Sequence, residues 1–214
     1  MSTPVNNYAV QVERARALFC TRDRGAMCAR LGLTQTADGD IPLRFLGENY
    51  RVRPDGTVLT SGGAAASFGA AMAIYDVLAR DNAPVLSGDF VPTAALHRIH
   101  GTHAVHEDLN SPAARRFAGR AAELSAALAA RGGRRWGPGD VSYILDVFDF
   151  FPVCLRFYDA DEEFPASLQF LWDANALDFL YYETLWYVMG ELVEDIARVV
   201  ALGSPSGGAV SEAD

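Results

Sequence analysis

Apolar side chains recur every three or four residues in four stretches of the chain, which is the period of a helix that buries one face. These stretches are residues 8–19, 68–79, 117–128 and 185–199. We therefore expect four amphipathic helices. The first should pack on a sheet, and the last should cover a sheet's apolar face.

Residues typical of helix caps indicate where two of the predicted helices begin or end. Ser111-Pro112 offers an N-cap and a proline at the first helical position, so the third long helix should continue from there to Gly132-Gly133. A short helix is predicted from Asp23 to Leu31. It should end at Gly32, which adopts a left-handed conformation easily.

Segments rich in aromatic and β-branched residues, separated by turn residues, form two groups typical of antiparallel meanders. The first group is residues 41–45, 50–53 and 57–60, and the second is residues 141–148, 153–158 and 167–172. A short extended segment is expected near residues 88–91. Together with the helices, these strands predict a single α+β domain, residues 1–202, built as a twisted and mainly antiparallel sheet with packed helices. Residues 203–214 are small, polar and acidic, and we expect a disordered tail there.

Charge and composition exclude several classes of partner. The chain has 27 acidic and 18 basic residues and a formal net charge of −9, which disfavours nucleic acid and anionic membrane surfaces. No apolar run approaches the roughly 18 residues of a membrane span, and no secretory signal is evident, so we expect a cytoplasmic protein. The cysteines Cys20, Cys28 and Cys154 are expected to be thiols, because their number and spacing suit neither disulfides nor a bound iron-sulfur cluster.

All four histidines lie within ten residues at a spacing of three, as His97, His100, His103 and His106, with Glu107 following. Imidazole is the commonest ligand of transition metals, so this cluster predicts a metal site, for zinc as an example, with Glu107 as general base for a bound water. One helix would offer two of these ligands to an ion, whereas a curled loop would bring three together. The alternative is an exposed polar connection in which the spacing is coincidental.

Two other groups of residues are candidates for ligand binding. The glycine-rich loop from Arg131 to Asp140 carries Arg134, Arg135 and Trp136, which suit an anionic ligand through bidentate contacts and stacking. The alternative is a solvated basic loop. Asp173 and Glu183 flank a largely apolar connection; if partly buried, these carboxylates must be paired, capped or protonated, although Glu183 can instead cap its helix.

Several motifs resemble an uncharacterised bacterial and archaeal family known only as a domain of unknown function, DUF3786. The most specific lie in the carboxy-terminal third, and the resemblance spans nearly the whole chain to about Val200. The motifs are Asn7-Tyr8, Leu46 to Val52, Val85 to Phe90, Phe157 to Ser167, Leu171-Trp172-Asp173, Tyr182-Glu183 and Gly190-Glu191-Leu192.

The resemblance implies a context rather than an activity. Members occur in anaerobes, alone or fused behind a domain that binds an iron-sulfur cluster of the kind seen in corrinoid proteins. This chain lacks the cysteine-rich segment, so an iron-sulfur or corrinoid-type protein would be a separate partner. Asp173 and Glu183 match the family pattern, whereas the histidine run does not belong to it.

Three functional hypotheses follow. The first is a non-catalytic cytoplasmic accessory protein that binds a small cofactor or a redox partner in anaerobic metabolism. The second is a metal-dependent hydrolase that uses the segment from His97 to Glu107, and the third is a structural interaction module. The shape of the pockets should discriminate them. An apolar cleft with Trp172, Tyr182 and the arginine-rich loop favours cofactor binding, convergent histidines favour the enzyme, and a flat apolar patch favours the interaction module.

Overall fold

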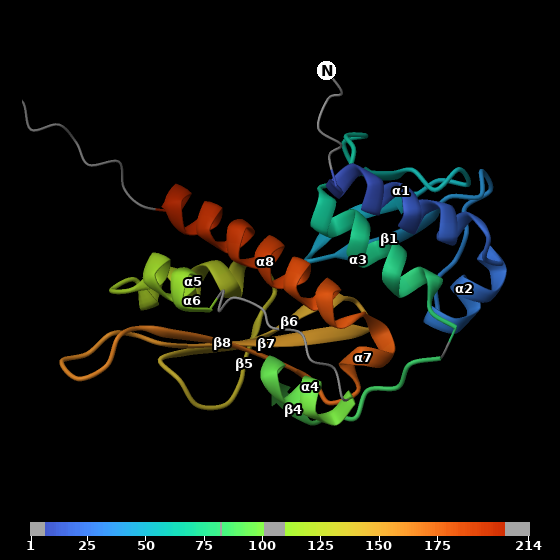
Figure 1. Ribbon diagram of the computed structural model, residues 1–214. Coiled ribbons are helices and arrows are strands. Elements are labelled where there is room, and N and C mark those ends of the chain that lie inside the picture. The colour runs from blue at the N-terminus through green and yellow to red at the C-terminus, as the bar shows by residue number, and fades with distance from the viewer. Residues whose placement is uncertain (1–6, 82, 101–109, 204–214) are drawn as a thin grey trace, which may run out of the picture.

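The computed structural model describes residues 7–81, 83–100 and 110–203. These described residues form eight helices and eight strands (Figure 1). The helices are α1 (Asn7–Cys20), α2 (Arg24–Leu31), α3 (Phe68–Ala79), α4 (Thr93–His100), α5 (Asn110–Phe117), α6 (Ala121–Ala130), α7 (Ala176–Phe179) and α8 (Tyr182–Gly203). The strands are β1 (Ile41–Phe45), β2 (Glu48–Val52), β3 (Val58–Thr60), β4 (Phe90–Pro92), β5 (Arg134–Arg135), β6 (Val141–Phe148), β7 (Phe151–Tyr158) and β8 (Ser167–Asp173). The predicted α+β class is confirmed.

The larger sheet has the strand order β4-β8-β7-β6-β5, with every neighbouring pair antiparallel. Its β6-β7-β8 meander is the one predicted from the sequence. Alternate residues of β8, Leu168, Phe170 and Trp172, are buried on one face. Helices α5, α6 and α8 lie over this face (Figure 1), as expected for the terminal helix.

The smaller sheet, β1-β2-β3, is the second predicted meander. It joins the larger sheet through a hydrogen bond from Leu46 N to Val147 O at 2.9 Å. The rings of Phe45 and Phe148 meet at the same junction, 5.4 Å apart. One continuous core therefore includes residues of both sheets.

Helix α3 is buried on almost every side because its sequence is apolar all round. It lies between α1 and α8 and contacts both (Figure 1). The expectation that α1 packs on a sheet is therefore wrong: α1 packs chiefly on α3. Phe19 at its end is fully buried, whereas Tyr8 in its first turn remains 62% exposed.

Three sequence expectations about local structure are corrected or refined. The helix predicted from Ser111 to Gly132 is broken into α5 and α6, because the chain turns at Gly119 with a φ of 72°. The loop from Arg131 to Asp140 contains the short strand β5, which pairs with β6. The extended segment expected near residues 88–91 becomes a strand only from Phe90.

The ends of α2 follow the prediction in detail. The side chain of Asp23 caps the helix by accepting a hydrogen bond from Ala26 N at 2.6 Å. Gly32 ends it in a left-handed conformation with a φ of 66°. These caps fix the positions of Arg22, which precedes the helix, and of Arg30, which lies in its last turn.

The expected tail, residues 203–214, lies outside the described residues from 204 onward. In the part of the chain that the structure describes, no helix combines the length and the apolar character needed to cross a membrane.

Candidate functional site

The histidine cluster falls largely outside the described part of the chain. His97 and His100 belong to the last turn of α4, but their side chains are not described, and His103, His106 and Glu107 lie in the undescribed residues 101–109. Elsewhere in the described ranges, no group of three or more histidine, cysteine, aspartate or glutamate residues is arranged to hold a metal ion. The metal site therefore stays a prediction.

The residues of the arginine-rich loop make separate contacts. Arg134 forms an ion pair with Asp146 at 3.0 Å, and this partner raises the pKa of Arg134. The guanidinium of Arg135 lies 6.0 Å from the ring of Tyr143. The ring of Trp136 lies 5.2 Å from that of Phe90, so the chain after β5 brings this side chain beside β4. Arg134 is thus already neutralised by a carboxylate, and anion binding by these three residues stays a prediction.

Asp173 is a buried carboxylate that is saturated with hydrogen bonds. It accepts from Ser87 N at 3.0 Å, Ser87 Oγ at 2.9 Å, Gly88 N at 2.8 Å and Asn175 N at 2.9 Å. Burial acts to raise its pKa, but these hydrogen bonds outweigh burial and hold the pKa of Asp173 below its ordinary value. The carboxylate joins the segment before β4 to the end of β8. Glu183 is exposed in the first turn of α8, so the structure does not bring the two acids into one site.

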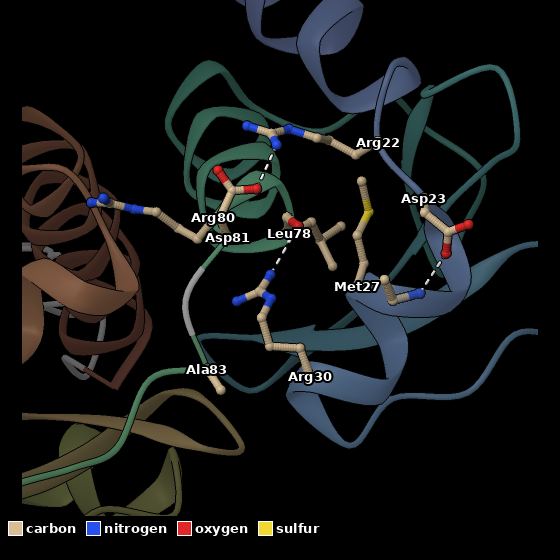
Figure 2. A pocket seen from close by; sticks show the side chains of 9 residues that line it. Arg22, Asp23, Met27, Arg30, Leu78, Arg80, Asp81 and Ala83 are labelled. Atoms are coloured by element: carbon tan, nitrogen blue, oxygen red, sulfur yellow. Dashed lines mark hydrogen bonds and ion pairs between the residues drawn. The ribbon is translucent and has the colours of Figure 1, made fainter.

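A cleft lies between α2 and the carboxy-terminal end of α3, with a volume of about 470 Å³ (Figure 2). We call it the arginine cleft. Three arginines, two aspartates and four apolar residues line it: Arg22, Arg30, Arg80, Asp23, Asp81, Ala26, Met27, Leu78 and Ala83. Its size lies within the range of small-molecule sites, and its lining combines apolar surface with a few charged groups.

Each arginine is held by a different contact. Arg30 donates to the last carbonyls of α3, with Nη2 at 2.8 Å from Val77 O and 2.9 Å from Leu78 O. Arg22 pairs with Asp81. Figure 2 shows Arg22 and Arg30 on either side of Leu78, while Asp23 turns away to cap α2. The carboxylate of Asp81 thus pairs with Arg22 and also acts, as a nearby charge, on Arg30.

The third arginine, Arg80, points toward the side of the cleft where α8 begins (Figure 2). Its guanidinium lies 3.8 Å from the ring centre of Tyr181. Burial lowers the pKa of Arg30; the nearby Asp81 partly offsets this effect, and the positive charge of Arg80 adds to it. Arg30 and Arg80 are thus close enough to repel each other, and an anion beside Arg30 would relieve that repulsion.

Some donors of the cleft have no acceptor among the described residues. The Nε atoms of Arg22 and Arg80 are buried, and neither makes a hydrogen bond in the described structure. Arg80 Nε has only a long contact with Asp76 Oδ1, at 3.5 Å. A buried donor without an acceptor is costly, but both Nε atoms are covered by protein, so a ligand in the cleft would meet the terminal nitrogens of the arginines instead.

Asp76 contacts Arg80, one of the arginines that line the cleft, and the sequence did not predict this role. Its Oδ2 accepts a hydrogen bond from Tyr181 N at 2.6 Å, at the start of α8, and its Oδ1 faces Arg80. Burial raises the pKa of Asp76 to about 6, although the hydrogen bonds from Tyr181 and Thr184 and the charge of Arg80 act in the opposite direction. The signal was present: Asp76 is the one charged residue between Phe68 and Ala79.

The arginines of the cleft were also missed, for a different reason. Arg22, Arg30 and Arg80 sit at or near the ends of ordinary helices, and basic residues are common there. Nothing in their spacing sets them apart. Only the contact between α2 and α3 brings them together.

Comparison with known proteins gives one match. A family model described as a domain of unknown function (DUF3786) matches residues 23–195, a range that contains every residue of the cleft except Arg22. No curated protein matches the chain. No solved structure matches it either.

Proposed function

Because the chain belongs to the DUF3786 family, whose description names no activity, we propose its function from its geometry: a non-catalytic protein that binds a small anionic ligand in the arginine cleft. The observation that carries the proposal is that Arg22 and Arg30 lie on either side of the apolar Leu78 in a cleft of about 470 Å³, with Arg80 at its rim. Guanidinium groups are well suited to carboxylates and phosphates, because their planar fork donates two parallel hydrogen bonds.

The lining also indicates the shape of the ligand. Met27 and Leu78 offer apolar surface between the arginines, so the ligand should carry an apolar part beside its anionic group. A carboxylate or phosphate attached to a ring or a short hydrocarbon fits this description. A free inorganic anion would leave the apolar floor uncovered.

A binding role is favoured over catalysis by the residues at hand. The described residues that line the cleft include no serine, cysteine or histidine, and Asp23 is occupied as the cap of α2. A nucleophile and a base within hydrogen-bonding reach of each other, the usual pair in covalent catalysis, are therefore not found among them.

This proposal keeps the small-cofactor hypothesis from the sequence and places its site at the arginine cleft. A cofactor with a phosphate or carboxylate group would satisfy the chemistry. The iron-sulfur or corrinoid-type partner implied by the family resemblance is a separate prediction, on which the ligand-binding proposal does not depend.

Titration calorimetry with phenyl phosphate tests the proposal, because this probe combines a ring with a doubly charged group. We expect saturable binding that weakens about tenfold or more in Arg22→Gln, since a charge-assisted hydrogen bond is lost. The matched control is Arg198→Gln, which removes a solvent-exposed arginine of α8 and should bind like the wild type. Equal weakening in both variants would indicate general charge attraction and contradict the proposal.

The variant Asp81→Asn should bind phenyl phosphate more tightly than the wild type, and so gives a second test. Asp81 competes with the ligand for Arg22, and its side chain is 73% exposed, so the change should leave the fold intact. Phenyl phosphate should then bind about threefold more tightly, as expected for the removal of a partly exposed competing charge. Unchanged or weaker binding would place the probe elsewhere.

A further inference from the structure

A second hollow lies at the other end of α1, away from the arginine cleft. Four aromatic residues, two glycines and one acid line it: Tyr8, Phe68, Trp186, Tyr187, Gly69, Gly190 and Glu191. Its volume is about 430 Å³, and we call it the aromatic groove. Tyr8 belongs to the first turn of α1, whereas Arg22 follows its last turn, so the two sites are separated by the length of that helix.

The rings of the groove are held at angles to one another. Tyr8 and Phe68 lie 4.8 Å apart with an interplanar angle of 66°. Phe68 and Tyr187 lie 4.9 Å apart at 72°. These edge-to-face contacts fix three rings in a row without closing the groove, and Tyr8 is left 62% exposed. Phe68, Trp186 and Tyr187 are partly exposed beside it, and contiguous apolar surface of this kind often marks a binding site.

The floor of the groove is open because it lacks side chains. Gly190 belongs to α8, and a Cβ atom there would meet nothing within 4 Å. At Gly69 in α3 a Cβ atom would come within 2.7 Å of Glu191 Cγ. The glycines thus leave room above the helices and let the Glu191 side chain lie against α3.

The charge of the groove is negative. The described residues that line it include Glu191 and no lysine, arginine or histidine. Glu191 is fixed in place, because its Oε1 accepts a hydrogen bond from Ser67 Oγ at 2.7 Å. Burial raises the pKa of the Tyr187 hydroxyl, and the charge of Glu183 adds to this rise, so a second carboxylate acts on the same rings.

We propose that the aromatic groove binds an organic ammonium cation, such as a trimethylammonium group. The faces of aromatic rings attract cations, and a methylated ammonium group is large, weakly hydrated and able to contact several rings at once. The carboxylate of Glu191 complements its charge. A neutral apolar ligand would use the rings but would gain nothing from Glu191, and an anion would be repelled.

The groove also accounts for two motifs that the arginine cleft leaves unexplained. Asn7-Tyr8 and Gly190-Glu191 lie at opposite ends of the sequence; Gly190-Glu191 falls within residues 23–195, which match the family model, and Asn7-Tyr8 precedes them. The fold brings Tyr8, Gly190 and Glu191 to the lining of one groove. A shared ligand is a reason for these residue types to occur together.

Titration calorimetry with choline on the full chain tests the proposal. The comparison probe is the uncharged carbon isostere of choline, in which a tert-butyl group replaces the trimethylammonium group. We expect saturable binding of choline that is about threefold to thirtyfold tighter than binding of the isostere, the range of cation–π attraction. Equal binding of the two probes, or binding of neither, would overturn the proposal.

Two variants locate the bound cation. Tyr8→Leu keeps apolar bulk but removes one ring face, and Glu191→Gln removes the charge while its amide oxygen can still accept from Ser67. Each should weaken choline binding about threefold or more. Phe164→Leu, which removes an aromatic ring that is 65% exposed outside the groove, is the matched control and should bind like the wild type. If Phe164→Leu weakens binding as much as Tyr8→Leu, the cation is not in the groove and the proposal is wrong.

Discussion

Two buried aspartates show how the number of donors around a carboxylate decides its chemistry. Asp173 accepts three backbone hydrogen bonds and one from the hydroxyl of Ser87, and its pKa is lowered despite burial. Asp76 is also buried but has fewer donors: Tyr181 N and the side chain of Thr184 donate to it, and Arg80 makes only a long contact. Its pKa is raised to about 6 because burial outweighs these contacts. Asp173 is thus a structural link, and Asp76 is the carboxylate that responds to pH.

A prediction at the residue scale concerns Asp76→Asn, which imitates the protonated acid. Because the pKa of Asp76 is about 6 in the folded protein, above its value in the unfolded chain, its contribution to stability is full below about pH 4 and is lost as the pH rises through 6. The free energy of unfolding of the wild type, relative to Asp76→Asn, should therefore fall by up to about 3 kcal/mol between pH 4 and pH 7. Urea denaturation at a series of pH values measures this difference. Asp38→Asn, at an exposed aspartate, is the matched control and should show no such pH dependence. If the stability of the wild type relative to Asp76→Asn rose with pH, the raised pKa of Asp76 would be contradicted.

At the scale of elements, the contact between α3 and α8 connects the capping of one helix to the side chains of the other. Ser67 Oγ accepts from Ala70 N at the start of α3 and donates to Glu191 in α8. At the opposite end of α3, Asp76 accepts from the backbone at the start of α8. The helices are therefore held together by two polar contacts in addition to their apolar faces, and these contacts fix how α8 crosses α3.

Gly69→Ala tests how tightly these helices meet. Alanine has a higher helix propensity than glycine, which by itself would stabilise α3. Its Cβ, however, would lie 2.7 Å from Glu191 Cγ, so the Glu191 side chain must move and lose its hydrogen bond to Ser67. We expect a loss of about 1 kcal/mol in the free energy of unfolding, measured by urea denaturation. In a Glu191→Ala background the same change should be neutral or stabilising, because the side chain that would clash with the new Cβ has been removed. Equal effects in both backgrounds would show that Glu191 is not the obstacle.

At the scale of the whole molecule, the two sheets share one core rather than forming separate units. The bond from Leu46 to Val147 and the contact between Phe45 and Phe148 join them directly. Helix α8 contacts α3 on one side and α5 and α6 on the other (Figure 1). Removing either sheet would expose apolar surface on the other.

We therefore expect the chain to unfold in a single cooperative transition. In scanning calorimetry, the van't Hoff enthalpy should equal the calorimetric enthalpy within error, and circular dichroism and tryptophan fluorescence should give the same midpoint. Two separated transitions would instead indicate that the sheets unfold independently, against the prediction of a single domain.

The sequence predicted the regular elements well because their signals are local. The limits of α2 followed from its capping residues Asp23 and Gly32, and α3 from an apolar stripe that ends where the structure ends it. The break between α5 and α6 was missed because the apolar spacing continues across Gly119, and a single glycine within such a pattern is ambiguous. Of the candidate site residues, Asp173 was expected to need hydrogen-bond partners if buried, and the structure gives it four donors. Which groups donate could not be predicted from the local sequence, because Ser87 and Gly88 lie far from Asp173 in the chain.

By itself, the sequence determined the class of fold, most of the longer helices and strands and the strand pairing within the two meanders, because these depend on periodicity and turns within about 20 residues. It did not predict α7, β5 or the division between α5 and α6. The tertiary structure alone decided that β4 pairs with β8 and that Arg22, Arg30 and Arg80 share a cleft. It also decided that Tyr8 meets Glu191 at the aromatic groove. Such contacts join residues far apart in the chain, and no periodic pattern encodes them. They arise when apolar faces are buried together, and the polar and aromatic residues at the rims of those faces are then brought side by side.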